Sequence, residues 1–147
     1  MPKYKFRFET LQKVREARRT QQRLALAEAF RAEQVLMEKR AELSAEESAL
    51  RALQHSAREG KYLDVNRLIE AQRYELLLKA RGQEFAKQAT LLAAETERRR
   101  QTLVEADREV RVLELLDERH RKEHNLRRER QEMKRLDEAA QIRRNGF

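Results

Sequence analysis

Residues 58–64 read Arg-Glu-Gly-Lys-Tyr-Leu-Asp, and this short stretch separates two long runs of helix-forming sequence. Gly60 is suited to a left-handed position after a helix end, and Asp64 is suited to accept hydrogen bonds from the free N–H groups that open a second helix. The chain's one proline, Pro2, precedes every periodic segment, so no proline ring interrupts either run. The stretch therefore predicts a turn between two helices.

The apolar residues on the two sides of this turn pair so that their residue numbers add up to about 121. Within each run they step by three and four residues, which is the heptad spacing of a coiled coil. A constant sum is what one antiparallel helical hairpin produces. The predicted pairs are Leu11 with Val110, Val14 with Ala106 or Asp107, Ala25 with Thr96, Ala29 with Leu92, Ala32 with Ala89, Leu36 with Phe85, Leu43 with Leu78, Leu50 with Ala71, and Leu53 with Leu68.

The predicted fold class is therefore all-α, with two long helices forming an antiparallel coiled-coil hairpin. We expect a single coiled-coil domain over residues 1–147, with helix 1 at about 5–58, a turn at about 59–63 and helix 2 at about 64–142. The C-terminal helix is longer, so roughly 25 of its residues overhang, on the order of 40 Å at 1.5 Å per residue. Both chain ends then lie at one pole of the hairpin.

Some positions of the predicted seam are irregular. Gly82 faces Lys39, where the missing side chain leaves room for the lysine stem, although a merely tolerated glycine is an equal alternative. Glu46 faces Glu75, and we expect flanking basic residues to screen these like charges. Polar seam residues fix the register of a coiled coil and lower its stability.

The composition excludes most catalytic classes. Charged residues make up 41% of the chain and aromatic residues 5%, which suits long helices and leaves too little apolar volume for a layered globular core. There is no cysteine, no glycine-rich phosphate loop, no nucleophile elbow and no HExxH sequence. His120 and His124, with Glu123, would form an incomplete metal site. We therefore expect no enzyme activity, no metal and no cofactor.

The charge is concentrated toward the two ends. Residues 1–31 carry nine Lys or Arg and three Asp or Glu, and residues 118–144 carry ten and six, whereas the middle is slightly acidic. A hairpin brings both ends together as a basic pole, which favours acidic partner surfaces. Acidic residues are interleaved throughout and no nucleic-acid motif is present, so we expect no nucleic-acid partner. No apolar run is long enough to span a membrane and no secretory signal is evident, so we expect a cytoplasmic protein without membrane insertion.

Two apolar regions exceed what a two-helix seam buries. In the overhang a stripe out of phase with the seam predicts docking on a partner, with self-association or a frayed helix as alternatives; it consists of Leu126, Met133, Leu136 and Ala140. Beside the turn, a second group predicts either a protein-binding surface or a sealed hairpin end; it consists of Tyr62, Leu63, Ile69, Tyr74, Leu76 and Leu77.

Three segments together resemble the FliJ family of flagellar type III export proteins: FRFETLQKVREARR near the start, GKYLDVNRL at the turn followed by Tyr74, and REVRVLELLDERHRKEHNLRRERQEMKRLDEAA near the end. The resemblance covers nearly the whole chain. It implies a two-helix component of the flagellar type III export apparatus, similar in shape to the central stalk of rotary ATPases. Such a protein binds and stimulates the hexameric export ATPase, and contacts the export gate and export chaperones. Because the hairpin forms within one chain, we also expect a monomer in isolation.

On this sequence the expected ATPase-binding residues, chosen from charge and exposure at the basic pole, are Phe8, Leu11, Arg15, Arg18, Arg19, Arg127, Arg128, Met133, Arg135 and Leu136. The expected residues that bind the export gate lie near the turn and are Tyr62, Leu68, Tyr74 and Leu78. Two alternatives remain open from the sequence. One is a structural coiled-coil scaffold, such as a dimer of two straight chains, and the other is the equivalent stalk of a virulence-type secretion system.

Overall fold

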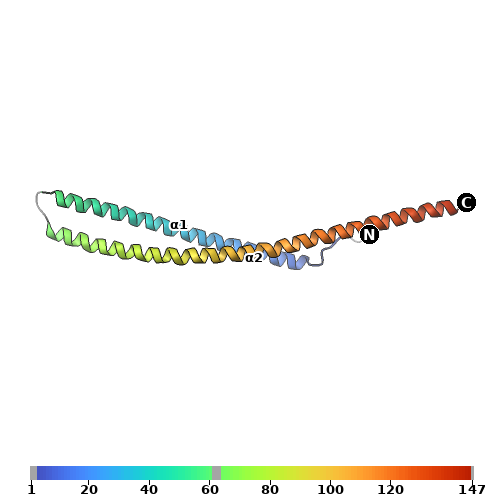
Figure 1. The fold of residues 1–147 in the computed structure, drawn as a ribbon, viewed down its shortest axis with the longest axis horizontal. Coiled ribbons are helices and arrows are strands. Elements are labelled where there is room, and N and C mark those ends of the chain that lie inside the picture. The colour runs from blue at the N-terminus through green and yellow to red at the C-terminus, as the bar shows by residue number, and fades with distance from the viewer. Residues whose placement is uncertain (1–2, 61–63, 147) are drawn as a thin grey trace. The chain divides into compact units, whose positions relative to one another are not determined.

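A computed structural model describes residues 3–60 and 64–146 of the chain. It contains two helices, α1 (Glu9–Glu59) and α2 (Val65–Asn145), and no strand within the described ranges. The helices pack against each other in the antiparallel sense, so the all-α hairpin predicted from the apolar spacing is confirmed. In Figure 1 the parts of α1 and α2 within residues 23–102 run side by side.

The start of α2 is fixed by the residue that the sequence singled out. The Asp64 carboxylate accepts hydrogen bonds from the backbone N–H groups of Asn66 and Arg67, at 3.1 and 3.4 Å. This N-cap satisfies two of the donors that a helix start leaves free. Gly60, by contrast, does not have the left-handed conformation expected of it, because no described glycine has a positive φ.

The helix α1 begins at Glu9, although the sequence pattern places its start at about residue 5. The backbone turns into the helix through hydrogen bonds from Glu9 N–H to the Phe6 carbonyl and from Gln12 N–H to the Phe8 carbonyl. Glu9 in the first turn carries the charge that a helix N-terminus favours. Residues 3–8 therefore form a non-helical segment, called here the N-terminal strap.

The chain divides into two compact units. Unit 1 combines the chain up to Gln22 with the part of α2 from Leu103 onward, and unit 2 runs from Arg23 to Thr102. Both helices pass through both units. Each unit is described by itself below.

Unit 2 is built on a strict heptad of α1. Its buried residues there are Ala29, Leu36, Leu43 and Leu50, each seven residues apart. Leu43 and Leu50 form a cluster with Leu78 of α2, which is only 1% exposed, and Ala71 and Phe85 pack on that cluster. These contacts match the predicted pairing of Leu43 with Leu78.

Polar residues of unit 2 find partners across the helices. Glu46 accepts a hydrogen bond from the Tyr74 hydroxyl at 3.1 Å and lies 3.8 Å from Arg81, while Glu75 accepts one from Gln54 at 3.3 Å. The two glutamates are therefore each compensated by a different partner. Further along, the buried Thr96 hydroxyl lies 2.7 Å from a Glu33 oxygen, and the Arg99 guanidinium donates to the Ala25 carbonyl at 2.6 Å.

Four residues of the predicted pairs are exposed. Leu53 is 68% exposed, Val14 is 58% exposed and Leu11 is 40% exposed, and Ala32 also faces solvent. A pair of helices covers only a narrow stripe of each, so residues one position off that stripe face water. Gly82 faces Leu43 rather than the expected Lys39, because a Cβ on Gly82 would lie 3.6 Å from the Leu43 side chain.

Candidate functional site

The N-terminal strap is held on α2 by aromatic side chains of unit 1. The Tyr4 hydroxyl lies 2.7 Å from the Asp117 carboxylate and 3.2 Å from the carbonyl oxygen of the same residue. The ring of Tyr4 lies 5.5 Å from that of His124, and the buried Phe6 ring lies 5.8 Å from that of His120. Both histidines therefore serve as apolar contacts for the strap, and the described residues contain no cluster of three metal-ligating side chains.

The environment of Tyr4 favours its neutral form. Burial, followed by the hydrogen bond to Asp117, raises the pKa of Tyr4 to about 12, although the Arg121 guanidinium 5.1 Å from the ring centre acts in the opposite direction. A neutral phenol donates to Asp117 over the whole physiological pH range. The strap is thus tied to α2 by a hydrogen bond whose donor stays protonated.

The strap and α2 together present a basic surface. Lys3, Lys5 and Arg7 are exposed on the strap. They line one shallow pocket with Tyr4, the imidazoles of His120 and His124, Arg127 and one acidic residue, Glu123. Phe8, one of the predicted ATPase-binding residues, is half-buried, with its ring 5.8 Å from Phe6 and beneath the Arg7 guanidinium.

The arginines predicted on α1 are occupied by contacts across the seam. Arg15 forms an ion pair with Glu109, Arg18 lies 3.6 Å from the same carboxylate, and Arg19 lies 3.9 Å from Asp107. The hydrogen bond from Arg15 is the main cause that lowers the pKa of Glu109. These three side chains join the two helices of unit 1, a role that charge counting did not reveal.

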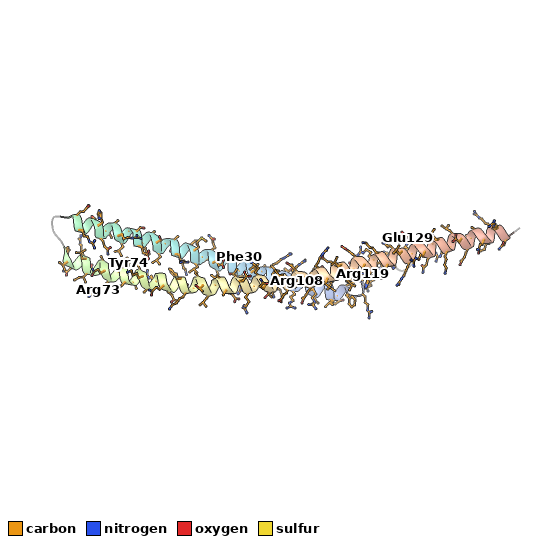
Figure 2. The ribbon with its side chains drawn as sticks, in the orientation of Figure 1. Phe30, Arg73, Tyr74, Arg108, Arg119 and Glu129 are labelled. Atoms are coloured by element: carbon orange, nitrogen blue, oxygen red, sulfur yellow. The ribbon has the colours of Figure 1, made fainter. Side chains whose placement is uncertain are left out.

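Beyond the strap, every described residue of α2 from Asn125 onward is exposed. Figure 2 labels Glu129 on this stretch, which we call the C-terminal overhang (residues 125–145). It carries seven Lys or Arg and four Asp or Glu. The overhang predicted from the unequal helix lengths is therefore present in unit 1, and it is basic.

Arg127, Arg128 and Arg135 do not share a face with the apolar residues predicted beside them. At 100° per residue, Arg128 lies about 140° around α2 from Met133, and Arg135 lies about 100° from Leu136. Met133 and Leu136 are 68% and 70% exposed. The overhang thus presents a basic face and a separate apolar face.

The residues predicted to bind the export gate fall into three groups. Tyr62 lies outside the described residues. Leu68 is half-buried, and Tyr74 is 40% exposed with its hydroxyl on Glu46, so both border a groove of unit 2 next to the turn. Leu78 is 1% exposed and packs with Leu43 and Leu50 in the core, so in this structure it does not reach the surface of the groove.

A further apolar face was not singled out from the sequence. Val112 and Leu115 of α2 are 63% and 48% exposed, and they do not belong to the buried seam. A heptad count begun at Leu126 and continued backward reaches both residues, so the signal was present in the spacing. Among the described residues, no helix is long and apolar enough to cross a membrane.

Comparison with known proteins decides the family. The model of the family described as "Flagellar FliJ protein" matches residues 4–146, nearly the whole chain. The chain belongs to the flagellar FliJ family. Neither the curated proteins nor the solved structures contain a match to it. Family membership makes this a flagellar, export-related protein. The surfaces described above lie on the two helices of this FliJ-family chain.

Proposed function

We propose that this FliJ-family chain is a stalk-like, non-catalytic component of the flagellar type III export apparatus that binds the hexameric export ATPase and stimulates it. The observation that carries the proposal is the C-terminal overhang, which is helical, fully exposed and basic. A helix that extends past the end of its partner helix and remains regular is suited to enter the central opening of a ring. In this proposal the protein is cytoplasmic and peripheral at the apparatus, and monomeric in isolation.

Electrostatic attraction would bring this surface to the ATPase. Arg127, Arg128 and Arg135 lie on the basic face of the overhang, and the exposed Lys3 and Lys5 of the strap add to it. Charges of this kind raise the rate of association with an acidic surface, and salt screens them over about 8–10 Å. The proposal therefore gives the overhang and strap the direct contact. Arg15, Arg18 and Arg19 support it by joining the helices, while Phe8 ends the strap and Leu11 follows it in the first turn of α1.

The stimulation follows from symmetry. A single helix with one basic face and one apolar face cannot contact six ATPase subunits alike. It binds best to the subunit whose conformation offers the complementary surface, and so favours that conformation over the others. Differential binding of this kind biases which ATPase site closes next.

The test is an ATPase assay with purified export ATPase. The double variant Arg128→Glu and Arg135→Glu changes the basic face, and the matched control, Arg40→Glu with Arg73→Glu, makes the same change in charge on exposed residues of unit 2. We expect stimulation by the unmodified chain that falls with added salt, little stimulation by the overhang variant, and normal stimulation by the control. Equal stimulation by both variants would refute the contact.

A second surface is proposed for the export gate and for export chaperones. The groove of unit 2 that Leu68 and Tyr74 border is lined by both apolar and polar side chains and lies next to the turn, where Leu53 and Val65 are also exposed. Exposed apolar patches with tyrosine are typical of protein-binding surfaces. A pull-down with the cytoplasmic domain of the gate tests it: Tyr74→Ser should reduce capture, and Leu91→Ser, an exposed leucine elsewhere in unit 2, should not. Equal capture by both variants would remove the groove from the proposal.

A further inference from the structure

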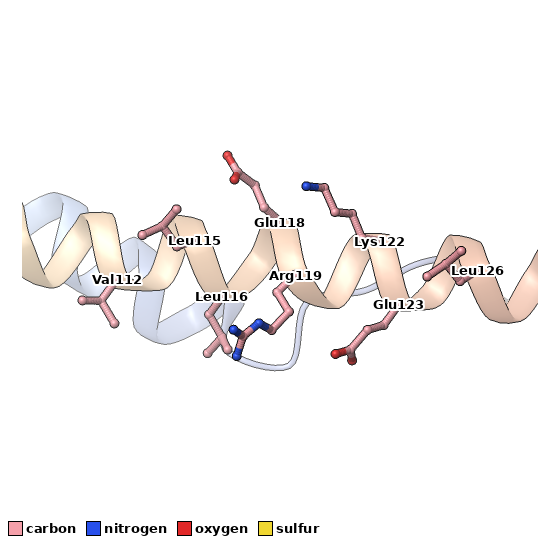
Figure 3. Close-up of a pocket in the computed structure, with 8 residues that line it drawn as sticks. All are labelled: Val112, Leu115, Leu116, Glu118, Arg119, Lys122, Glu123 and Leu126. Atoms are coloured by element: carbon pink, nitrogen blue, oxygen red, sulfur yellow. The ribbon is translucent and has the colours of Figure 1, made fainter.

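The outer face of α2 in unit 1 carries an apolar groove that no contact within the unit covers. Its floor consists of Val112, Leu115, Leu116 and Leu126, and four charged residues complete its lining. Val112, Leu115 and Leu126 are 63%, 48% and 53% exposed. In Figure 3, Glu118 and Lys122 project on one side of the helix, and Arg119 and Glu123 on the other. The groove therefore has an apolar floor, with Arg119 and Lys122 near its middle and Glu118 and Glu123 at its edges.

This groove belongs to a second heptad register of the same helix. The seam register of α2 in unit 1 comprises Leu103, Ala106, Val110, Leu113, Asp117, His120 and His124. The second register is offset from the first by two residues, as from Val110 to Val112. It comprises Val112, Leu115, Arg119, Lys122, Leu126, Glu129, Met133, Leu136 and Ala140. An offset of two residues is 200° around an α-helix, so the two registers occupy opposite faces. One face holds the strap and α1, and the other is unpartnered.

The second register also explains the phase of the apolar stripe in the overhang. Leu126 and Met133 do not continue the seam, but they continue the series that Val112 and Leu115 begin. The series from Val112 to Ala140 is about 42 Å long at 1.5 Å per residue, which is enough for a coiled coil with another helix. A heptad series of this length is a binding site for a helix rather than for an extended peptide.

A second copy of this chain is a poor occupant. In a parallel pair each core layer faces its own copy, so Arg119, Lys122 and Glu129 would give three layers of like charge, the first two of them adjacent. In an antiparallel pair that sets Val112 against Leu136, Arg119 would face Glu129 in the core, but Glu123 would flank its own copy and Glu118 would flank Glu132. Either arrangement leaves like charges together, which is destabilising.

We propose that this face docks an amphipathic α-helix of another protein, with apolar residues in the heptad core and acidic residues in the two layers that meet Arg119 and Lys122. Basic residues beside that core would meet Glu118 and Glu123, which line the edges of the groove. The docked helix would be a third helix of unit 1, packed on α2 opposite the strap. The site shares Met133 and Leu136 with the proposed ATPase contact, but the groove at Val112 and Leu115 lies outside that contact.

The probe is a synthetic helical peptide of four heptads with leucine in the core, glutamate in the two layers opposite Arg119 and Lys122, and lysine at the flanks. A second peptide carries lysine in those two layers instead. Binding of each labelled peptide to the full chain is followed by fluorescence anisotropy. We expect the acidic-layer peptide to bind at least about tenfold more tightly than the other, which corresponds to about 1.4 kcal/mol.

Variants of the chain identify the site. Val112→Ser with Leu115→Ser should weaken binding at least about tenfold, and Leu91→Ser in unit 2 should leave it unchanged. The reversed chain, with Arg119→Glu and Lys122→Glu, should prefer the lysine-layer peptide. Circular dichroism checks that each variant keeps its helices. Should the serine variant unfold, the reversed chain decides alone, because it keeps the apolar floor.

Other results would overturn the inference. Equal binding of the two peptides to the unmodified chain, or an unchanged preference in the reversed chain, would exclude the charge pairing. If light scattering finds a dimer, and the serine substitutions convert it to a monomer, the face binds a second copy of this chain. Since no ATPase is present, these results leave the proposed function untouched.

Discussion

The seam predicts a large difference between two neighbouring leucines of α2. Leu78 is 1% exposed and packs with Leu43 and Leu50, whereas Leu76 is 67% exposed. Replacing a buried leucine with alanine costs about 2–5 kcal/mol, from lost burial and from the cavity left behind. A two-helix seam can partly close such a cavity, so we expect Leu78→Ala to cost about 2–3 kcal/mol. Leu76→Ala should cost about 0.5 kcal/mol or less.

Thermal unfolding followed by circular dichroism at 222 nm measures this difference. For a chain of this size 1 kcal/mol corresponds to about 2–4 °C, so Leu78→Ala should lower Tm by about 4–12 °C. Leu76→Ala, the same chemical change on the exposed side of the helix, should leave Tm nearly unchanged. Equal losses in the two variants would mean that the seam does not follow the heptad described here, and the assignment of every exposed face on α2 would fail with it.

Three further changes test separate contacts. Gly82→Ala should stabilise the chain by about 0.5–1 kcal/mol in urea unfolding, because its Cβ would make an ordinary 3.6 Å contact with Leu43; a loss would show that the helices lie closer than described. The pKa of Tyr4 is raised from 10.0 to about 12, which means that the folded chain favours the neutral phenol. The strap contact of Tyr4 therefore adds to the free energy of unfolding below pH 10, and this contribution is lost as pH rises toward 12. Tyr4→Phe should remove that alkaline loss in pH-dependent melting, and an unchanged loss would contradict it. Thr96→Val removes the hydroxyl that lies 2.7 Å from Glu33 and should cost about 1–2 kcal/mol in the same urea assay, whereas no loss would mean that water replaces this contact.

The sequence could predict the fold because the fold is set by spacing. Leu36, Leu43 and Leu50 are seven residues apart and are all buried, and Asp64 caps α2 as its chemistry suggests. The antiparallel pairing follows from the same residues. These features depend on local helix geometry and on one periodic pattern, both of which can be read without coordinates.

The limits of the prediction also have physical causes. Val14 fits the heptad count but is exposed, because two helices in contact bury only a narrow stripe. The strap could not be foreseen, since its attachment depends on Tyr4 reaching Asp117 more than a hundred residues away. Helix propensity near residue 5 gave way to this tertiary contact.

The candidate site was foreseen in part. Exposure of Arg128 and Met133 follows from the overhang, which the unequal helix lengths predict. Charge alone could not show that Arg15 pairs with Glu109 within the seam. The heptad spacing did place Leu78 in the seam, and its burial there is at odds with its second assignment to the gate-binding surface.

The central claim is that one chain pairs its own two helices in the antiparallel sense, which leaves the end of α2 without an internal partner. The chain has no cysteine, so cysteines placed at Glu46 and Arg81 can each take a spin label, and the two side chains approach to 3.8 Å in this structure. Dipolar broadening of the spectrum should persist when the labelled chain is refolded with an excess of unlabelled chain. Loss of the broadening on dilution would show that the contact joins two molecules and would contradict the account.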